Sequence, residues 1–363
     1  MHWRRTLTVA LAAGALLTSG CTGDTSPAPE GSTPAPTQAE GLWPLTGLPG
    51  YPNSDQDQII TVKVDKTPSG QPQRGIGGAD LVVQELVEGG VTRLAAMYQS
   101  SDPGTVGPVR SMRVSDIGIV LPTGGTLASS GGEQSTIRAI QAAGIPIVVE
   151  DDPAFSRATD RPMPYNLMLD LGALALTLPP GRPPGAYLPF GDLPGDAPSR
   201  DAAAVTLTWP AAVSRFTYDP ADQLWTLDGA PVPADFGFTT VIAIEVPVEF
   251  TGGRDSSGSP IPTLVTEGSG RATVAAAGRV FRVRWAKASP ESPWTFSYDP
   301  APGTSASPGA GGSADSGSGD ASAQAASPFL IPAGRTWIGL LPVEGGAVTV
   351  TAPDPTPSSP ATP

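Results

Sequence analysis

Cysteine and histidine are almost absent from this chain, and their scarcity excludes several classes of chemistry. The 363 residues include one cysteine, Cys21, and one histidine, His2. Because both fall in a segment with the features of a signal peptide, the rest of the chain has neither thiol nor imidazole. It lacks the residues of a Ser-His-Asp triad, a Cys-His nucleophile, a His- or Cys-ligated zinc site, a haem site and a disulfide. The remaining chemistry belongs to carboxylates, arginines, hydroxyls, amides and the backbone.

Basic residues are also scarce. The chain has 34 Asp and Glu residues against 21 Lys and Arg residues, a formal net charge of −13 at pH 7. Nucleic acid is bound mainly by basic patches, so we predict no nucleic-acid partner. The glycines of a dinucleotide-binding fingerprint and of a P-loop are missing, and residues 55–57 lack the Gly and Glu of an EF-hand loop. We therefore predict no cofactor and no metal site.

The first 21 residues have the three parts of a bacterial export signal. Two arginines precede an apolar run from Leu7 to Leu17, which is too short to cross a hydrocarbon core of about 30 Å as a helix. The string Leu-Thr-Ser-Gly-Cys that ends at Cys21 resembles the bacterial lipobox, although Thr18 stands where leucine is usual. We predict that residues 1–21 are a lipoprotein signal peptide. Cys21 would carry the lipid and anchor the protein on the outer face of the cytoplasmic membrane.

Glycine and proline are abundant instead, at 44 and 43 residues, and concentrate in low-complexity segments. Such segments bury too little apolar surface to offset the entropy lost on folding. We predict a disordered tether at residues 22–41, a Pro-rich connector at 179–200, a low-complexity insertion at 299–327 and a disordered tail at 352–363.

Residues 42–178 have the pattern of an N-terminal α/β domain. Apolar runs at 81–88 and 91–99 flank Gly89-Gly90, which predicts a β-hairpin, with a helix from Ala79 as the alternative. Elsewhere strand and helix periodicities alternate behind glycine turns, as in α/β folds. The predicted strands are 59–65, 126–130 and 145–149, and the predicted helices are 111–120, 133–143 and 170–178.

Residues 201–351 have the pattern of a β-rich C-terminal domain, in which short apolar runs are separated by turn residues. In the run 280–285, Arg282 and Arg284 alternate with apolar residues, so one face of that strand should be exposed to water. The predicted fold class is thus α+β or α/β, an α/β domain followed by a β-rich domain. The predicted strands are 205–209, 215–218, 224–227, 241–250, 263–267, 271–275, 280–285 and 336–342.

Three arginines, Arg93, Arg110 and Arg113, lie close together in the sequence and near Glu85 and Glu88. A guanidinium group can bind phosphate or carboxylate through two parallel hydrogen bonds, so these arginines could line an anion-binding cleft. The alternative, which the spacing alone favours, is structural. Glu85 and Arg93 would then form a cross-strand ion pair, and the other arginines would be solvated.

Ser111 and the turn Ser130-Gly131-Gly132 add a second candidate for anion binding. Each is expected to begin a helix, and the free N–H groups of a helix N-terminus attract anions.

Paired carboxylates keep an enzyme open as an alternative. Glu85 and Glu88, or Asp151 and Asp152, are of the residue type that performs acid and base catalysis in glycosidases or binds Ca²⁺ and Mg²⁺. Carboxylates adjacent in sequence are more often solvated, so we lean away from an enzyme.

Several strings of this sequence resemble, in the same order, those of a known family, the YerB-like lipoproteins of Gram-positive bacteria, whose domains are of unknown function. The resemblance implies an N-terminal α/β domain and a β-rich C-terminal domain. The strings are Pro44–Pro49, Ala79–Val82 followed by Glu85 to Arg93, Gly107–Ser111 with Arg113, Gly131–Glu133, Gly268–Gly270, Trp285–Lys287 and Gly334–Ile338.

The resemblance also bears on the candidate site. Asn166 ends a Pro-Tyr-Asn string where the family has Pro-His-Asn, so an activity that needs that imidazole would be lost in this chain. A function based on arginines and carboxylates would be intact. The residues that match the family's strongest motifs are Glu85, Glu88, Arg93, Arg110, Ser111 and Arg113.

These observations predict a membrane-anchored, non-enzymatic lipoprotein of the cell envelope. It would bind an anionic or glycan ligand, such as a cell-wall glycan or a phosphate-bearing polymer. Two alternatives stay open: a carboxylate-only hydrolase acting on an envelope polymer, and an accessory scaffold for an envelope protein partner. Ligand identity and oligomeric state are left open. The predicted ligand-binding residues are Arg93, Arg110, Ser111, Arg113, Glu85, Glu88, Gly131, Gly132 and Asn166.

Overall fold

The computed structural model describes residues 41–52, 58–181, 183–230, 236–254, 258–298 and 326–354. The predicted signal peptide with Cys21, almost all of the tether, and most of the insertion and tail lie outside these ranges. Within them, no helix is long and apolar enough to span a bilayer.

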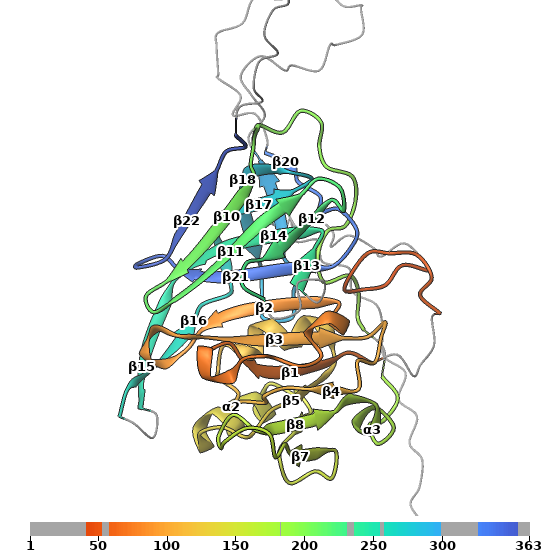
Figure 1. The fold of residues 1–363 in the computed structure, drawn as a ribbon, viewed down its shortest axis with the longest axis vertical. Coiled ribbons are helices and arrows are strands. Elements are labelled where there is room, and N and C mark those ends of the chain that lie inside the picture. The colour runs from red at the N-terminus through yellow and green to blue at the C-terminus, as the bar shows by residue number, and fades with distance from the viewer. Residues whose placement is uncertain are drawn as a thin grey trace, which may run out of the picture. The chain divides into compact units, whose positions relative to one another are not determined.

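A twelve-stranded sheet runs through both predicted domains (Figure 1). Strand β21 (Thr336–Pro342) lies parallel between β14 (Thr240–Val246) and β2 (Leu81–Leu86), so one late strand pairs with both halves of the chain. Every residue of β21 is buried, as expected for a strand covered on both faces. The other strands are, on one side, β20 (Ser327–Pro328), β19 (Thr295–Tyr298), β18 (Arg279–Lys287) with β9 (Ser199–Asp201) beside it, and β17 (Gly268–Ala276), and, on the other side, β3 (Thr92–Tyr98), β1 (Ile60–Asp65), β5 (Thr126–Ala128) and β6 (Ile147–Val148).

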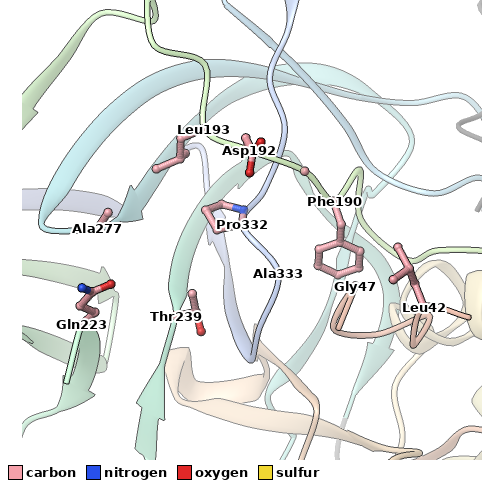
Figure 2. Close-up of a pocket in the computed structure, with 11 residues that line it drawn as sticks. Leu42, Gly47, Phe190, Asp192, Leu193, Gln223, Thr239, Ala277, Pro332 and Ala333 are labelled. Carbon is pink, nitrogen blue, oxygen red and sulfur yellow. The ribbon is translucent and has the colours of Figure 1, made fainter. Parts of the chain in front are cut away.

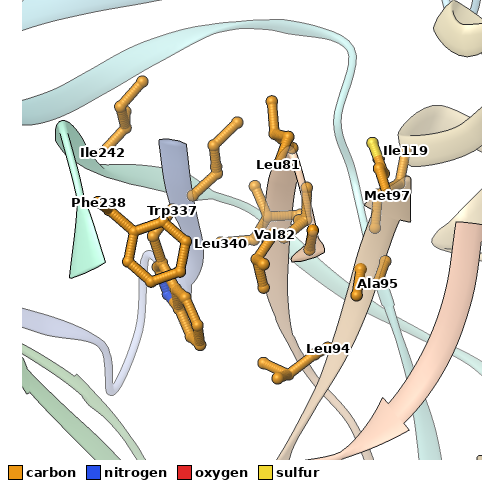
Figure 3. Packing of buried hydrophobic residues seen from close by; sticks show 14 of the residues in the cluster. Leu81, Val82, Leu94, Ala95, Met97, Ile119, Phe238, Ile242, Trp337 and Leu340 are labelled. Atoms are coloured by element: carbon orange, nitrogen blue, oxygen red, sulfur yellow. The ribbon is translucent and has the colours of Figure 1, made fainter. Parts of the chain in front are cut away.

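A five-stranded sheet packs on the large sheet around β21. The Trp337 ring lies 5.3 Å from the Phe216 ring and 5.2 Å from the Phe238 ring between centroids. Figure 3 shows the Trp337 and Phe238 rings against each other in this core. Trp209 Nε1 donates to the Leu340 carbonyl at 2.7 Å, which ties the two sheets together. The strands of the smaller sheet are β13 (Gly237–Phe238), β12 (Leu224–Leu227), β11 (Ala212–Asp219), β10 (Ala204–Trp209) and β22 (Ala347–Thr351).

The described chain is mostly β with few helices, and the predicted α/β character of the N-terminal segment is only partly confirmed. β5 pairs parallel with both β1 and β6, and α2 (Gln134–Ala142) connects β5 to β6. β3, by contrast, pairs antiparallel with both β1 and β2. The remaining elements are α1 (Asp116–Val120), α3 (Leu171–Ala175), a sheet of β4 (Thr105–Val106), β8 (Leu167–Asp170) and β7 (Phe155–Arg157), a hairpin of β15 (Val248–Arg254) and β16 (Pro260–Leu264), and the 3-10 turns η1 (Pro68–Gly70), η2 (Ile76–Gly78), η3 (Glu88–Gly90) and η4 (Leu121–Thr123).

The hairpin predicted around Gly89-Gly90 is confirmed, since β2 and β3 pair in register on either side of it. The alternative helix from Ala79 is therefore wrong. The helix predicted from residue 170 is confirmed but shorter, because α3 ends at Ala175.

The helix predicted from Ser111 begins only at Asp116. The backbone before it pairs with a distant turn instead: Ser130 N donates to the Arg110 carbonyl at 3.0 Å, and Met112 N donates to the Gly131 carbonyl at 2.9 Å. The spacing of apolar residues correctly predicted that this segment is buried. It did not predict that the backbone bonds to a distant turn instead of forming a helix.

In the C-terminal segment the predicted strand 241–250 is two strands. β14 ends before Pro247 and β15 begins after it. A proline has no N–H to donate and cannot continue a central ladder. The exposed face of β18 is confirmed at Arg282 and Arg284. β19 ends just before the predicted insertion and β20 begins at Ser327, its last residue, and the two strands pair antiparallel as the strands of a hairpin do.

Candidate anion-binding site

One face of β1, β2 and β3 carries a row of charged side chains. The strand register places Arg93 opposite both Asp65 and Glu85. Lys63 shares this face because it lies two residues before Asp65 on the same strand. A buried charge is costly unless it is paired. Which of these side chains can still bind a ligand therefore depends on which are already paired with residues of the segment that leads into α1.

Lys63 lies at the centre of a fully buried triad. Its Nζ donates to Asp116 Oδ1 at 2.7 Å and to the Glu85 carboxylate, and no part of the three side chains is exposed. Burial, together with the Asp116 carboxylate, raises the pKa of Glu85 to about 7 against the opposing effect of Lys63. Burial alone would lower the pKa of Lys63, but Asp116 and Glu85 outweigh it and raise that pKa. Glu85 Oε2 has no hydrogen-bond partner in the described part of the chain.

Arg113 is held on several sides. Its guanidinium forms a two-point ion pair with Glu88, and its Nη1 donates to the Met112 carbonyl at 2.7 Å. Its backbone N donates to Asp116 Oδ2 at 2.7 Å. Only 9% of the side chain is exposed. Arg113 therefore ties η3 to the start of α1, and its donors are largely occupied by the protein itself.

Arg110 is partly exposed, and more so than Arg113. Its Nε lies 3.0 Å from Asp65 Oδ2, and 24% of its side chain is exposed. The guanidinium carbon lies 5.5 Å from the centre of the Tyr165 ring, and Nη1 is 3.4 Å from the Pro164 carbonyl. The family's Pro-His-Asn position is thus brought against Arg110, with tyrosine in place of histidine.

Arg93 is half-buried. Its Nη1 donates to the Ser111 carbonyl at 2.8 Å. Burial and the positive charges of Arg113 and Arg110 together lower the pKa of Arg93 to about 10, against the opposing effect of Glu88 and Glu85. The Arg93 guanidinium is therefore close enough to those of Arg110 and Arg113 to be repelled by both.

The two polar segments predicted to bind anions lie side by side. The Ser111 and Ser130 hydroxyl oxygens are 3.3 Å apart. Gly131 has a φ of 105°, and nothing lies within 4 Å of a Cβ placed there, so its backbone borders open space. Gly132 instead packs against Met112.

Ser111 does not begin a helix, because α1 starts only at Asp116. The turn Ser130-Gly131-Gly132 does lead into the predicted helix, since α2 begins at Gln134, but the N-cap residue Glu133 accepts from Ser135 N with its own carboxylate. That carboxylate already stands where an anion would bind. Any anion at this surface would be held by side chains rather than by a helix N-terminus.

Asn166 is engaged in local structure. Its Oδ1 accepts from Arg157 Nη1 at 2.9 Å, and its Nδ2 donates to the Ala158 carbonyl at 3.3 Å. These bonds connect the ends of the loop between β7 and β8, which presents Tyr165 to Arg110. Asn166 thus holds the loop that carries Tyr165, and neither of these two hydrogen bonds is made to Arg110.

Lys63 and Asp116, which organise the network, are not among the residues predicted from the sequence. A signal for Lys63 was present, because a lysine inside an apolar strand shares the face of Asp65 at period 2. Asp116 had no such signal, because its role depends on where α1 packs.

The geometry does not favour a carboxylate-only hydrolase. Such an enzyme needs two carboxyl groups facing each other across an accessible cleft. Glu85 is fully buried against Lys63, and Glu88 is bound by Arg113. Within the described ranges, no group of three or more potential metal ligands occurs.

The titration of Glu85 makes stability depend on pH. The pKa of Glu85 in the folded state, about 7, lies above the ordinary value of 4.5. Between these two pH values the folded state therefore binds more protons than the unfolded state. The contribution of Glu85 is fully present below pH 4.5 and is lost as pH rises through 7. We expect Glu85→Gln to lack this loss, so the variant should gain stability relative to wild type between pH 5 and 7.5. Urea unfolding of both proteins at several pH values measures the difference in their free energies of unfolding. If this difference does not change with pH, Glu85 does not have the raised pKa assigned to it.

The two halves of the chain match one family. The N-terminal domain of a family described as protein of unknown function (DUF3048) matches residues 45–179, and its C-terminal domain matches residues 204–310. A protein of Bacillus subtilis (strain 168) named "Putative lipoprotein YerB" is 44% identical over 70 residues, which are 19% of this chain and 21% of that protein. The match thus spans about a fifth of the relative's length, and the relative's name supports the lipoprotein prediction.

The fold has a match among solved structures. The crystal structure of the YerB protein from Bacillus subtilis aligns with a TM-score of 0.65 at 18% identity, over 85% of this chain and 99% of that chain. At this identity the likeness shows the fold alone. Because both domains of the family match in order and cover most of the described chain, the chain belongs to the DUF3048 family.

Proposed function

We propose that the protein is a lipid-anchored lipoprotein of the outer face of the cytoplasmic membrane, and that its N-terminal domain binds an anionic group of an envelope polymer. The proposed surface, the arginine rim, consists of Arg93, Arg110, Ser111, Ser130 and Gly131. The lipid on Cys21 would hold this domain near the wall.

The partial exposure of Arg110 is the observation that carries the proposal. Its Nε lies 3.0 Å from the Asp65 carboxylate without a hydrogen bond to it, its guanidinium carbon lies over the Tyr165 ring, and 24% of the side chain remains open. A guanidinium group oriented by neighbours loses little freedom when an anion binds, and it can donate two parallel hydrogen bonds to phosphate or carboxylate.

Arg93 supports the same proposal through charge. In the described ranges, no carboxylate lies within ion-pair distance of its guanidinium. An anion beside Arg110 would relieve the repulsion between Arg93 and Arg110. The Ser111 and Ser130 hydroxyls are hydrogen-bonded to each other at 3.3 Å, and the one that accepts in this bond can donate to the anion.

Five predicted residues are left out of the rim. The charges of Glu85, Glu88 and Arg113 are already engaged in buried ion pairs. Gly132 packs against Met112, and the Asn166 amide is bonded to Arg157 and to the Ala158 carbonyl.

Replacing Arg110 tests the proposal. We expect Arg110→Ala to lower binding to isolated Gram-positive cell-wall material at least tenfold, because a charge-assisted, two-point contact contributes about 1.5–3 kcal/mol. Arg110→Lys should recover only part of the binding, since an ammonium group cannot form the planar fork. Co-sedimentation at fixed low salt, with folding checked by circular dichroism, measures it.

Arg271→Ala is the matched control, because Arg271 is 76% exposed and pairs with Glu245 on the other domain. Its binding should equal that of the wild type. Inorganic phosphate should compete with the wall material if the ligand is phosphate-bearing, whereas a neutral polysaccharide should not. Equal retention of the Arg110→Ala variant and the wild type would refute the proposal.

A further inference from the structure

A second cavity, independent of the arginine rim, lies where the N-terminal loop, the Pro-rich connector and the turns of the β-rich segment meet (Figure 2). We call it the junction pocket. Its volume is about 390 Å³, within the range of small-molecule sites. Phe190, Leu193, Pro332 and Ala333 supply apolar walls. Pockets at the junction of two domains are common places for ligands.

The walls of the pocket are fixed by backbone contacts. Gly191 N donates to the Ile331 carbonyl at 2.9 Å, and Gly334 N donates to the Thr46 carbonyl at 2.7 Å. A Cβ placed on Gly47 would lie 2.5 Å from the Phe190 ring, so the ring packs directly on the glycine backbone. The pocket is therefore formed without a ligand.

Two polar side chains at the pocket are available to a ligand. Asp192 and Gln223 both line it and are both exposed. No hydrogen bond or ion pair engages either side chain among the residues that the structure describes. An apolar cavity with one free carboxylate at its edge favours a ligand with an apolar body and a single positive charge.

Backbone strain marks the same place. The two non-glycine residues of the described chain with a left-handed backbone are Gln223, with a φ of 56°, and Ala277, with a φ of 49°. Both line the pocket, from the β11–β12 and β17–β18 turns. A residue with a Cβ adopts this conformation at a cost in energy. At Ala277 the conformation belongs to the two-residue turn with Gly278, whose φ is 67°, and this turn requires a positive φ at both positions.

We propose that the junction pocket binds a small molecule that has an apolar body and one protonated amine, with Asp192 as the counter-ion and Gln223 as a second hydrogen-bond partner. The acidic net charge of −13 raises the local concentration of such cations. Phe190, Leu193 and Pro332 would cover the apolar part.

The test uses 2-phenylethylamine as the probe and 2-phenylethanol as its neutral analogue, titrated into the full chain and followed by amide chemical shifts. We expect the amine to bind at least tenfold more tightly than the alcohol. Asp192→Asn should abolish this preference, since it removes the charge and keeps the shape. Asp151→Asn, a change at another exposed carboxylate, should leave the preference intact and so measures non-specific attraction.

A second variant tests the cavity itself. Ala333→Leu places a larger side chain in the pocket and should weaken both probes at least fivefold, while Arg110→Ala should change neither. Equal affinity of amine and alcohol, an unchanged preference in Asp192→Asn, or wild-type binding by Ala333→Leu would each overturn the proposal.

Discussion

Lys63→Met is expected to destabilise the protein by about 3–5 kcal/mol at pH 8, the cost of leaving buried carboxylates without their cation. Lys63 is the shared partner of Glu85 and Asp116, and all three side chains are fully buried. Methionine keeps the length of the side chain but supplies no charge. The loss should be smaller at pH 5, because a protonated Glu85 needs no cation. Guanidinium unfolding at both pH values measures the effect.

Neutralising the whole triad is the control. Lys63→Met combined with Glu85→Gln and Asp116→Asn leaves no unpaired buried charge, and neutral replacements of a buried ion pair are often tolerated. The triple variant should therefore recover at least half of the stability lost by Lys63→Met alone. A single variant that loses less than about 1 kcal/mol, within the range of an exposed pair, would show that the triad is not the buried centre described above.

Trp337→Ala should destabilise the fold by about 3–5 kcal/mol through loss of a buried aromatic side chain. Trp337 is fully buried on β21 and packs against Phe216 and Phe238 of the smaller sheet. Because these rings come from the two sheets, the cavity would open between the large sheet and the smaller sheet. The midpoint of guanidinium unfolding, followed by circular dichroism, measures the change.

Trp337→Phe separates the ring from its N–H group. Trp337 Nε1 is buried without a hydrogen-bond partner in the described ranges, so losing it removes no favourable contact. Phenylalanine keeps the aromatic packing, and the cost should stay below about 1.5 kcal/mol. Equal losses for the alanine and phenylalanine variants would contradict this account of the core.

Local patterns predicted many of the elements. The Gly89-Gly90 turn, the strand at residues 336–342 and the alternating face of β18 all follow from neighbours within a few residues. Predictions failed where a remote segment competed for the backbone, as at Ser111. They also failed where a proline divided an apolar run, as at Pro247.

In the candidate site, too, local sequence could not predict the contacts with remote segments. Grouping Arg93, Arg110 and Arg113 was possible from spacing, but spacing cannot tell which arginine is occupied. Arg113 is taken by Glu88, whereas Arg110 remains partly open beside Tyr165. The difference arises because their partners come from other segments, η3 in one case and the β7–β8 loop in the other.

The near absence of cysteine and histidine, the acidic charge and the export-signal pattern were determined by the sequence alone, because they depend only on which residues are present and in what local order. Tertiary structure alone decided that Lys63 is buried between two carboxylates, that β21 joins the two halves, and that six separate segments enclose the junction pocket. Each of these depends on contacts between residues far apart in the chain. The energy of burying a charge or a ring depends on those neighbours.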